Sequence, residues 1–208
     1  LFALKKEQEK TDLSARPSYE LTNLQKFFVY ILKGATTSNV SIMFKLGESV
    51  DLERMKKAAE QLFEIHPILK NVIEPVGEKY MNIRNDDLTV DIPIFEMSDD
   101  DFGKEFKTLP KNYYYTKGEP LHHISIYKTE SAKYLLIDIA HIISDGYSLD
   151  IIIEDIEKLY NGQTVEKEKH DFYELILENT TESNSQTAVK RSEYLSSLMN
   201  GLKLDRSI

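Results

Sequence analysis

The 208-residue sequence contains no cysteine, which excludes a disulfide framework and any thiolate chemistry on this chain. Glycine and proline are also scarce, with 8 and 6 residues, and 41% of the residues are hydrophobic, as in an ordinary globular protein. No apolar run approaches the roughly 18 residues that a membrane span needs, and the charged residues 1–10 are unlike a signal peptide. We therefore expect a cytoplasmic protein without a membrane partner.

Positive charge is in deficit, and the net charge of −9 argues against a nucleic-acid partner, which would require a basic face. The length is sufficient for one good-sized core, or for one domain and a piece of another. The chain begins with Leu1 rather than methionine, which would fit a segment of a longer polypeptide.

The apolar periodicity predicts an alternation of helices and strands after a polar linker at residues 1–18. Thr22 or Ser18 could cap the first helix. The expected helices cover residues 19–32, 51–66, 98–109, 147–160, 171–179 and 186–201. The expected strands cover residues 40–46, 68–76, 79–83, 90–95, 121–128 and 133–143, and a polar loop is expected at 180–185. This order favours an α/β fold of the α+β type, a two-layer sandwich with a mixed sheet flanked by helices.

The stretch 133–143 is nearly all apolar, as a central strand covered on both faces should be. A period of two places His141 on one face with aliphatic residues such as Ile137 and Ile139. Residues 144–146 would then form a turn before the next helix. This arrangement places an imidazole, which titrates near pH 6.5, at the end of the sheet and beside a helix start.

Structural interpretations of the same residues remain open at this point. A single histidine in a strand is commonly a satisfied core residue. Asp145 is well placed to cap the following helix, and Gly146 could simply supply an unusual backbone angle.

Other residues that could bind a metal, stack on a base or act as a nucleophile are weaker candidates for a functional site. His122 and His123 are adjacent on a strand, so their rings face opposite ways and cannot share a metal. Without cysteines or a Glu-x-x-His spacing, no metal site is expected. The tyrosines at 113–115 suggest packing rather than base stacking. Ser144 and Ser148 could be imagined as nucleophiles, but neither lies in a nucleophile-elbow sequence.

The segment 140–146, Ala-His-Ile-Ile-Ser-Asp-Gly, resembles the motif of condensation domains in nonribosomal peptide synthetases and of the wider chloramphenicol acetyltransferase-like superfamily. That motif has two histidines, three residues, then Asp-Gly. The catalytic second histidine matches His141, and the Asp-Gly pair matches Asp145 and Gly146. The first histidine, mainly structural in the family, is replaced by Ala140. Residues 147–148 are Tyr-Ser where the family often has Trp-Ser.

Two upstream segments extend the resemblance. Residues 21–26 are similar to the opening motif of the family, and residues 63–70 are similar to its second motif. In the second motif, Ile65 and Lys70 stand in place of the family's arginines.

The resemblance implies a chloramphenicol acetyltransferase-like subdomain that forms an amide between a carrier-bound acyl thioester and a carrier-bound amine, in antibiotic or secondary metabolite biosynthesis. It makes His141 the catalytic residue. It makes Asp145 and Gly146 structural residues of the active site and Ser148 a candidate for substrate binding. It implies no directly bound cofactor, because the phosphopantetheine arms belong to partner carrier domains.

The resemblance also predicts the domain organisation. Residues 19–165 would be the N-terminal subdomain of a condensation domain, and residues 166–208 would cross toward a missing C-terminal subdomain. The isolated chain should then be inactive and could self-associate through its exposed face. Two alternatives stay open: a non-catalytic condensation-like module that recruits a carrier domain, and an acyltransferase that uses an acyl-coenzyme A donor and an alcohol.

Overall fold

The computed structural model describes residues 18–31, 35–36, 39–109, 112–114, 117–167 and 172–183. The predicted linker before residue 18 and the helix predicted at 186–201 lie outside these residues. Within them, no helix combines the length and apolar character that a membrane crossing requires.

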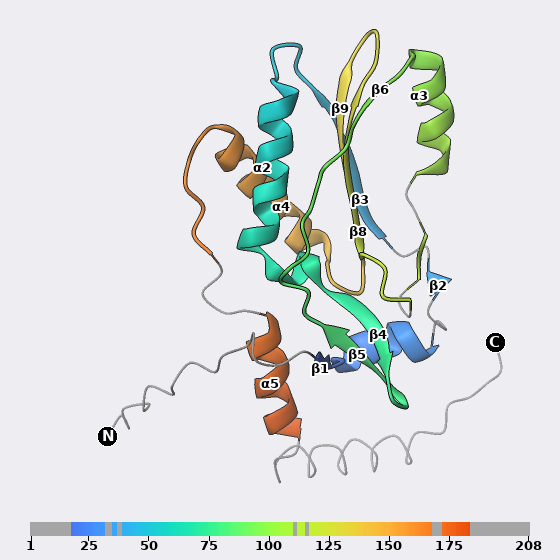
Figure 1. Ribbon diagram of the computed structural model, residues 1–208, viewed down its shortest axis with the longest axis vertical. Coiled ribbons are helices and arrows are strands. Elements are labelled where there is room, and N and C mark those ends of the chain that lie inside the picture. The colour runs from blue at the N-terminus through green and yellow to red at the C-terminus, as the bar shows by residue number, and fades with distance from the viewer. Residues whose placement is uncertain are drawn as a thin grey trace, which may run out of the picture.

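The main body is a four-stranded sheet with helices packed on it (Figure 1). The strand order is β3 (Asn39–Leu46), β9 (Lys133–Ala140), β8 (His122–Lys128) and β6 (Ile94–Glu96). The first three strands pair antiparallel, whereas β6 runs parallel to β8. Helices α2 (Leu52–Ile65) and α4 (Gly146–Tyr160) pack against the sheet and each other. The predicted mixed sheet flanked by helices is therefore confirmed.

The core lies between this sheet and the two helices, because alternate strand residues and one helical stripe are apolar. The strands contribute fully buried isoleucines such as Ile126, Ile137 and Ile139. Helix α2 contributes Leu62 and Phe63, and each fully buried side chain of this kind stabilises the fold by about 1.5–3 kcal/mol. Helix α3 (Asp99–Glu105) contacts the face of the sheet opposite to α2 and α4, near the start of β9. There the ring of Phe102 stacks on that of Tyr134, with the ring centroids 4.4 Å apart.

A second, smaller sheet lies next to the end of β9 that leads to His141 (Figure 1). It has the order β1 (Ser18–Glu20), β5 (Lys79–Ile83) and β4 (Val72–Val76), all antiparallel. Helix α5 (Phe172–Ser183) packs on β1, with the rings of Tyr19 and Tyr173 4.5 Å apart. A short pair, β2 (Ala35–Thr36) with β7 (Tyr113–Tyr114), completes the strands of the described residues.

The helix predicted at 19–32 begins later than expected. Tyr19 lies in β1, and α1 starts only at Asn23 and covers Asn23–Lys26. The reason is the cap: the hydroxyl of Thr22 accepts the backbone N–H of Gln25 at 3.1 Å, which confirms Thr22 rather than Ser18. The helix then continues as a π-helix, η2 (Phe27–Ile31).

Several other predicted boundaries were wrong, among them that of the strand expected at 90–95, which is β6 at Ile94–Glu96. The strand predicted at 68–76 begins at Val72, because Pro67 starts a 3₁₀ helix, η3 (Pro67–Lys70). The helix predicted to reach 109 ends at Glu105 and is followed by a 3₁₀ turn, η4 (Phe106–Thr108). The polar residues after 179 were expected to form a loop, but α5 continues to Ser183.

The strand expected to continue to residue 143 ends at Ala140. The N–H of Ile143 turns back to donate to the carbonyl of Ala140 at 3.1 Å, so residues 141–143 form a turn. His141 is therefore the first residue beyond a central strand, not part of its alternating face. The expected order of strand end, histidine, turn and helix is nevertheless present.

Candidate active site

His141 lies in the turn between β9 and α4, and its ring is partly buried. The ring Nδ1 is 2.6 Å from the backbone carbonyl of Ser144. A carbonyl can only accept a hydrogen bond, so Nδ1 must carry the proton and donate it. In the neutral ring, Nε2 therefore holds the lone pair and is the nitrogen able to take a proton.

The turn that holds His141 is fixed by its own hydrogen bonds. The hydroxyl of Ser144 donates to the carbonyl of Ala140 at 3.0 Å, which closes the turn over the strand end. The ring of Phe28, from η2, lies 5.7 Å from the His141 ring, centroid to centroid. The imidazole is thus held by a carbonyl at Nδ1 and by an aromatic neighbour. Ser144 is engaged in the turn and has no nucleophile-like setting.

Asp145 caps α4, as one interpretation of the sequence expected. Its carboxylate accepts the backbone N–H of Ser148 at 2.8 Å and the hydroxyl of Ser148 at 2.7 Å. These hydrogen bonds lower the pKa of Asp145, with a smaller contribution from the charge of His141. The Ser148 hydroxyl also accepts from the Asp145 N–H at 3.4 Å, so the two residues form a capping box.

Gly146 is the first residue of α4, and its backbone does not have a positive φ. The interpretation that it supplies an unusual backbone angle is therefore wrong. A Cβ placed on Gly146 would meet no atom within 4 Å, so this position borders open space.

The second motif joins α2 to α4. His66 caps the C-terminal end of α2, and its Nε2 lies 2.9 Å from the Asp155 carboxylate, both side chains being buried. The two residues are 89 positions apart, so their pairing leaves no local signal in the sequence.

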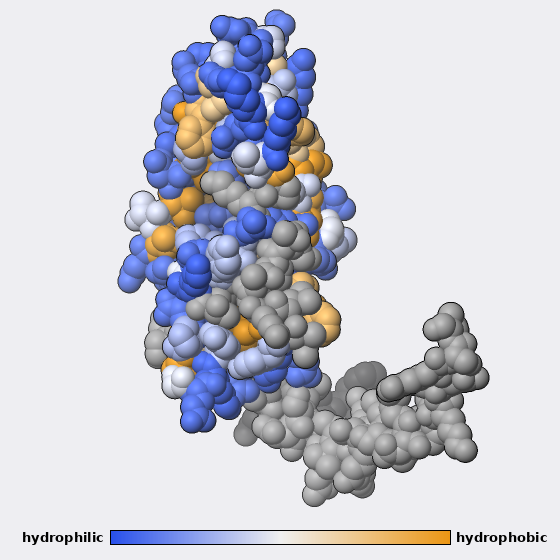
Figure 2. Space-filling model, turned by 90° about the vertical axis from the view of Figure 1, so that its right-hand side faces the viewer, coloured by the Kyte–Doolittle hydropathy of each residue, from blue (hydrophilic) through white to orange (hydrophobic). Residues whose placement is uncertain are grey.

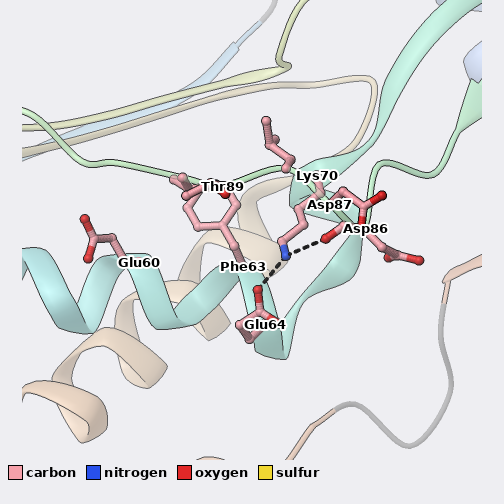
Figure 3. A pocket seen from close by; sticks show the side chains of 9 residues that line it. Glu60, Phe63, Glu64, Lys70, Asp86, Asp87 and Thr89 are labelled. Carbon is pink, nitrogen blue, oxygen red and sulfur yellow. Dashed lines mark hydrogen bonds and ion pairs between the residues drawn. The ribbon is translucent and has the colours of Figure 1, made fainter.

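A cavity of about 290 Å³ lies beside the same motif (Figure 3). It is lined by Glu60, Phe63, Glu64, Lys70, Asp86, Asp87, Leu88, Thr89 and Val90. The ammonium of Lys70 donates to the Glu64 carboxylate at 2.5 Å and to the Asp86 carbonyl at 3.3 Å (Figure 3). Lys70, which stands in place of the family's arginine, is therefore also positively charged, and its ammonium group is paired with a carboxylate. Residues 140–148 do not line this cavity.

His122 lies beneath α2 rather than at the active site. Its ring packs against Phe63 at 4.6 Å, and its buried Nε2 has no hydrogen-bond partner. Burial, with a smaller contribution from the charge of His123, lowers the pKa of His122 to about 4. Within the described part of the chain, no three histidine or carboxylate side chains gather as metal ligands.

Apolar side chains are exposed on the elements around His141. They include Leu24 from α1, Phe27 and Tyr30 from η2, and Tyr147 and Ile151 from α4. Tyr147, which follows Gly146 directly, is 76% exposed. On the face shown in Figure 2, hydrophilic side chains predominate and apolar ones occur in separate small groups.

Two residues near His141 were not assigned to the site from the sequence. Phe28 falls in the helix predicted at 19–32, and that prediction gave no indication of its contact with His141. Gln25, which is buried, donates from Nε2 to the Ile142 carbonyl at 3.5 Å. The Thr22-x-x-Gln25 spacing of a capping box was a signal that could have drawn attention to Gln25.

The family model of the condensation domain matches residues 15–205, so the chain belongs to the condensation domain family. Its curated relatives include a nonribosomal peptide synthetase and hybrid PKS-NRPS synthetases. Surfactin synthase subunit 1 of Bacillus subtilis (strain 168) is 30% identical over 154 residues, which are 72% of this chain and 4% of that protein. Bacitracin synthase 3 of Bacillus licheniformis is 30% identical over 161 residues, 74% of this chain and 2% of that protein.

Solved structures agree on the fold. The epimerization domain from the third module of tyrocidine synthetase B matches with a TM-score of 0.73 and 18% identity, over 91% of this chain and 46% of that one. The cyclization-docking bidomain of EpoB from Sorangium cellulosum matches with a TM-score of 0.74 and 17% identity, over 91% and 42%. The chain thus spans less than half the length of these structures.

Proposed function

We propose that this chain supplies the histidine-bearing half of a condensation site, in which an amine attacks an acyl thioester. The observation that carries the proposal is the hydrogen bond from Nδ1 of His141 to the Ser144 carbonyl. It leaves Nε2 as the proton-accepting nitrogen in a turn between a sheet end and a helix start.

In this reaction the amine nitrogen of the acceptor attacks the thioester carbonyl of the donor. The new C–N bond forms, the C–S bond breaks, and the amine proton passes by way of Nε2 of His141 to the departing thiolate. An α-amino group has a pKa of about 7.7–8.0, so a sizeable fraction is already neutral near pH 7.5. A general base contributes about 10²- to 10⁴-fold, and most where the nucleophile is hard to deprotonate. For an amine, His141 would therefore serve mainly to orient the nucleophile.

The neighbouring residues would support this role. Asp145 holds the start of α4 and thereby the turn that carries His141. The open space at Gly146 would leave room for a phosphopantetheine arm. Ser148 remains our candidate for substrate binding, although its hydroxyl is engaged with Asp145 here.

Condensation domains of nonribosomal peptide synthetases work with carrier domains, and we propose that such domains present both substrates to this chain. Residues 19–165 would form one wall of the site and residues 166–208 would cross toward a second subdomain. The solved structures support this arrangement because the chain spans 46% or less of the two described above. A cytoplasmic location and self-association through the exposed apolar residues also stay predictions.

The test is a condensation assay with an acyl-loaded donor carrier and an aminoacyl-loaded acceptor carrier, with the second subdomain present. His141→Asn is the informative variant, because its side-chain amide can still donate to the Ser144 carbonyl but has no group equivalent to Nε2. We expect His141→Asn to lose activity as His141→Ala does. Full activity of His141→Asn would show that the turn, not Nε2, is what matters. Absence of turnover in the unmodified protein would favour a non-catalytic recruiting module.

A further inference from the structure

Four buried polar side chains form a continuous series of hydrogen bonds between α5 and the turn of His141. The Tyr173 hydroxyl donates to Oδ1 of Asn71 at 2.8 Å, and Nδ2 of Asn71 donates to Oδ1 of Asn82 at 3.0 Å. Asn82 and Gln25 then exchange two bonds, at 2.9 and 3.1 Å. Each of the four residues is at most 2% exposed, so water does not replace a lost partner. We name these four residues the amide network.

The backbone fixes the direction of the amide network. Nδ2 of Asn82 donates to the Glu20 carbonyl at 3.2 Å, and a carbonyl can only accept. Oε1 of Gln25 accepts the N–H of Thr22 at 3.0 Å, and an N–H can only donate. Neither amide can therefore rotate end for end without placing like groups together. The NH₂ group of Gln25 is left facing the carbonyl of Ile142, 3.5 Å away.

The network reaches His141 by two routes. Ile142 follows His141 directly in the turn, and its carbonyl belongs to the Ile142–Ile143 peptide unit. The N–H of that unit closes the turn by donating to the Ala140 carbonyl, so the bond from Gln25 restrains the turn itself. Gln25 also anchors α1, and Phe28, one turn later, lies against the His141 ring. Phe28 and Ile142 pack in one buried cluster with Ala140, so the two routes meet below the turn.

We infer that Gln25 is a positioning residue for His141 and that the amide network makes the geometry of the turn depend on α5. This inference rests on the proposed role of His141. A buried polar group without a hydrogen-bond partner costs free energy, so loss of one member of the network should change the positions of the others. Removal of the Tyr173 hydroxyl leaves Oδ1 of Asn71 without this donor. Removal of the Gln25 amide leaves the Ile142 carbonyl without this donor. Asn82 then loses its two bonds to Gln25 and keeps the one from Asn71.

The test is nuclear magnetic resonance on the full 208-residue chain labelled with ¹⁵N and ¹³C, compared with Tyr173→Phe and Gln25→Met. The first readout is the tautomer of His141, read from its ring nitrogen shifts, which should show Nδ1–H in the unmodified chain. The second is hydrogen exchange of the Ile143 amide, which donates within the turn. We expect both variants to reduce the Nδ1–H population and to speed Ile143 exchange about fivefold, the factor of one net hydrogen bond.

Ile176→Val is the matched control, because Ile176 is a buried residue of α5 outside the amide network and the change removes only one methylene group. It should leave the His141 signals unchanged. Equal effects of Ile176→Val and Tyr173→Phe would overturn the inference, because general packing of α5 would then explain both. Unchanged His141 signals in Gln25→Met would overturn it as well, even if Tyr173→Phe does not fold. None of these measurements needs turnover, so failure of the condensation assay would leave them decisive.

Discussion

Replacement of the buried His122 should change how the stability of the fold depends on pH. The ring is under α2 against Phe63, and burial lowers its pKa to about 4. In the unfolded chain the same imidazole titrates near 6.5. Between these two values the unfolded state binds a proton that the folded state does not, so stability falls as the pH falls from about 6.5 toward 4.

The size of the effect follows from the two pKa values. A difference of about 2.5 units corresponds to about 3 kcal/mol once the pH is below both values, and about 2 kcal/mol of this is lost between pH 7 and pH 5. His122→Leu removes the titrating group. It also removes a buried Nε2 that has no hydrogen-bond partner, so the change should cost little at pH 7.

The assay is urea unfolding of the unmodified chain and of His122→Leu at several pH values between 7 and 5. The two curves of unfolding free energy against pH should diverge as the pH falls, with His122→Leu losing less stability. Ile124→Val, a buried change on the same strand face that removes no titratable group, should run parallel to the unmodified chain. Parallel curves for His122→Leu would refute the argument, because they would show that the imidazole gains its proton as easily in the folded state as in the unfolded one.

Three further predictions concern the proposed site. His141→Ala should reduce ester formation by up to about 10²- to 10⁴-fold and amide formation by less, because an alcohol depends far more on a base than an amine does; equal losses for the two acceptors would show that positioning alone explains His141. Asp145→Ala should lower stability by about 0.5–2 kcal/mol through loss of the α4 cap, as measured by the urea midpoint beside a condensation assay. A variant of unchanged stability but lost activity would make Asp145 a direct participant. This chain mixed alone with loaded carriers should form no condensed product, because proximity and orientation, which can supply about 7–11 kcal/mol, require both walls of the site. Product that His141→Ala abolishes would show that one wall is sufficient.

Local patterns in the sequence predicted the elements that carry the site. Helix α2 was predicted at 51–66 because its apolar residues recur at helical spacing, and the structure adds the cap by Asp51. The N-terminal cap of α4 by Asp145 was likewise among the expected interpretations. The predictions that were wrong concern residues whose structure depends on contacts with distant parts of the chain. Tyr19 fits a helical period, but pairing with β5 makes it part of a strand.

In the candidate site, too, local sequence predicted some features and distant contacts determine the others. The position of His141 between strand and helix followed from the chain order, whereas the state of its ring depends on the Ser144 carbonyl. That bond exists only because β9 ends at Ala140, and an apolar run that continues to Ile143 gave no sign of the end. The amide network joins residues separated by up to 102 positions, so no local pattern could have predicted it.

The complete burial of Ala140 limits which side chains this position can hold. Ala140 occupies the place of the first histidine in the family's motif, and here it packs against Leu21, Phe28 and Leu121 with no exposed surface. A histidine introduced at this position would meet a filled core, and overpacking of this kind typically costs about 1–3 kcal/mol. Ala140→His should therefore be better tolerated when one of those neighbours is replaced by a smaller side chain.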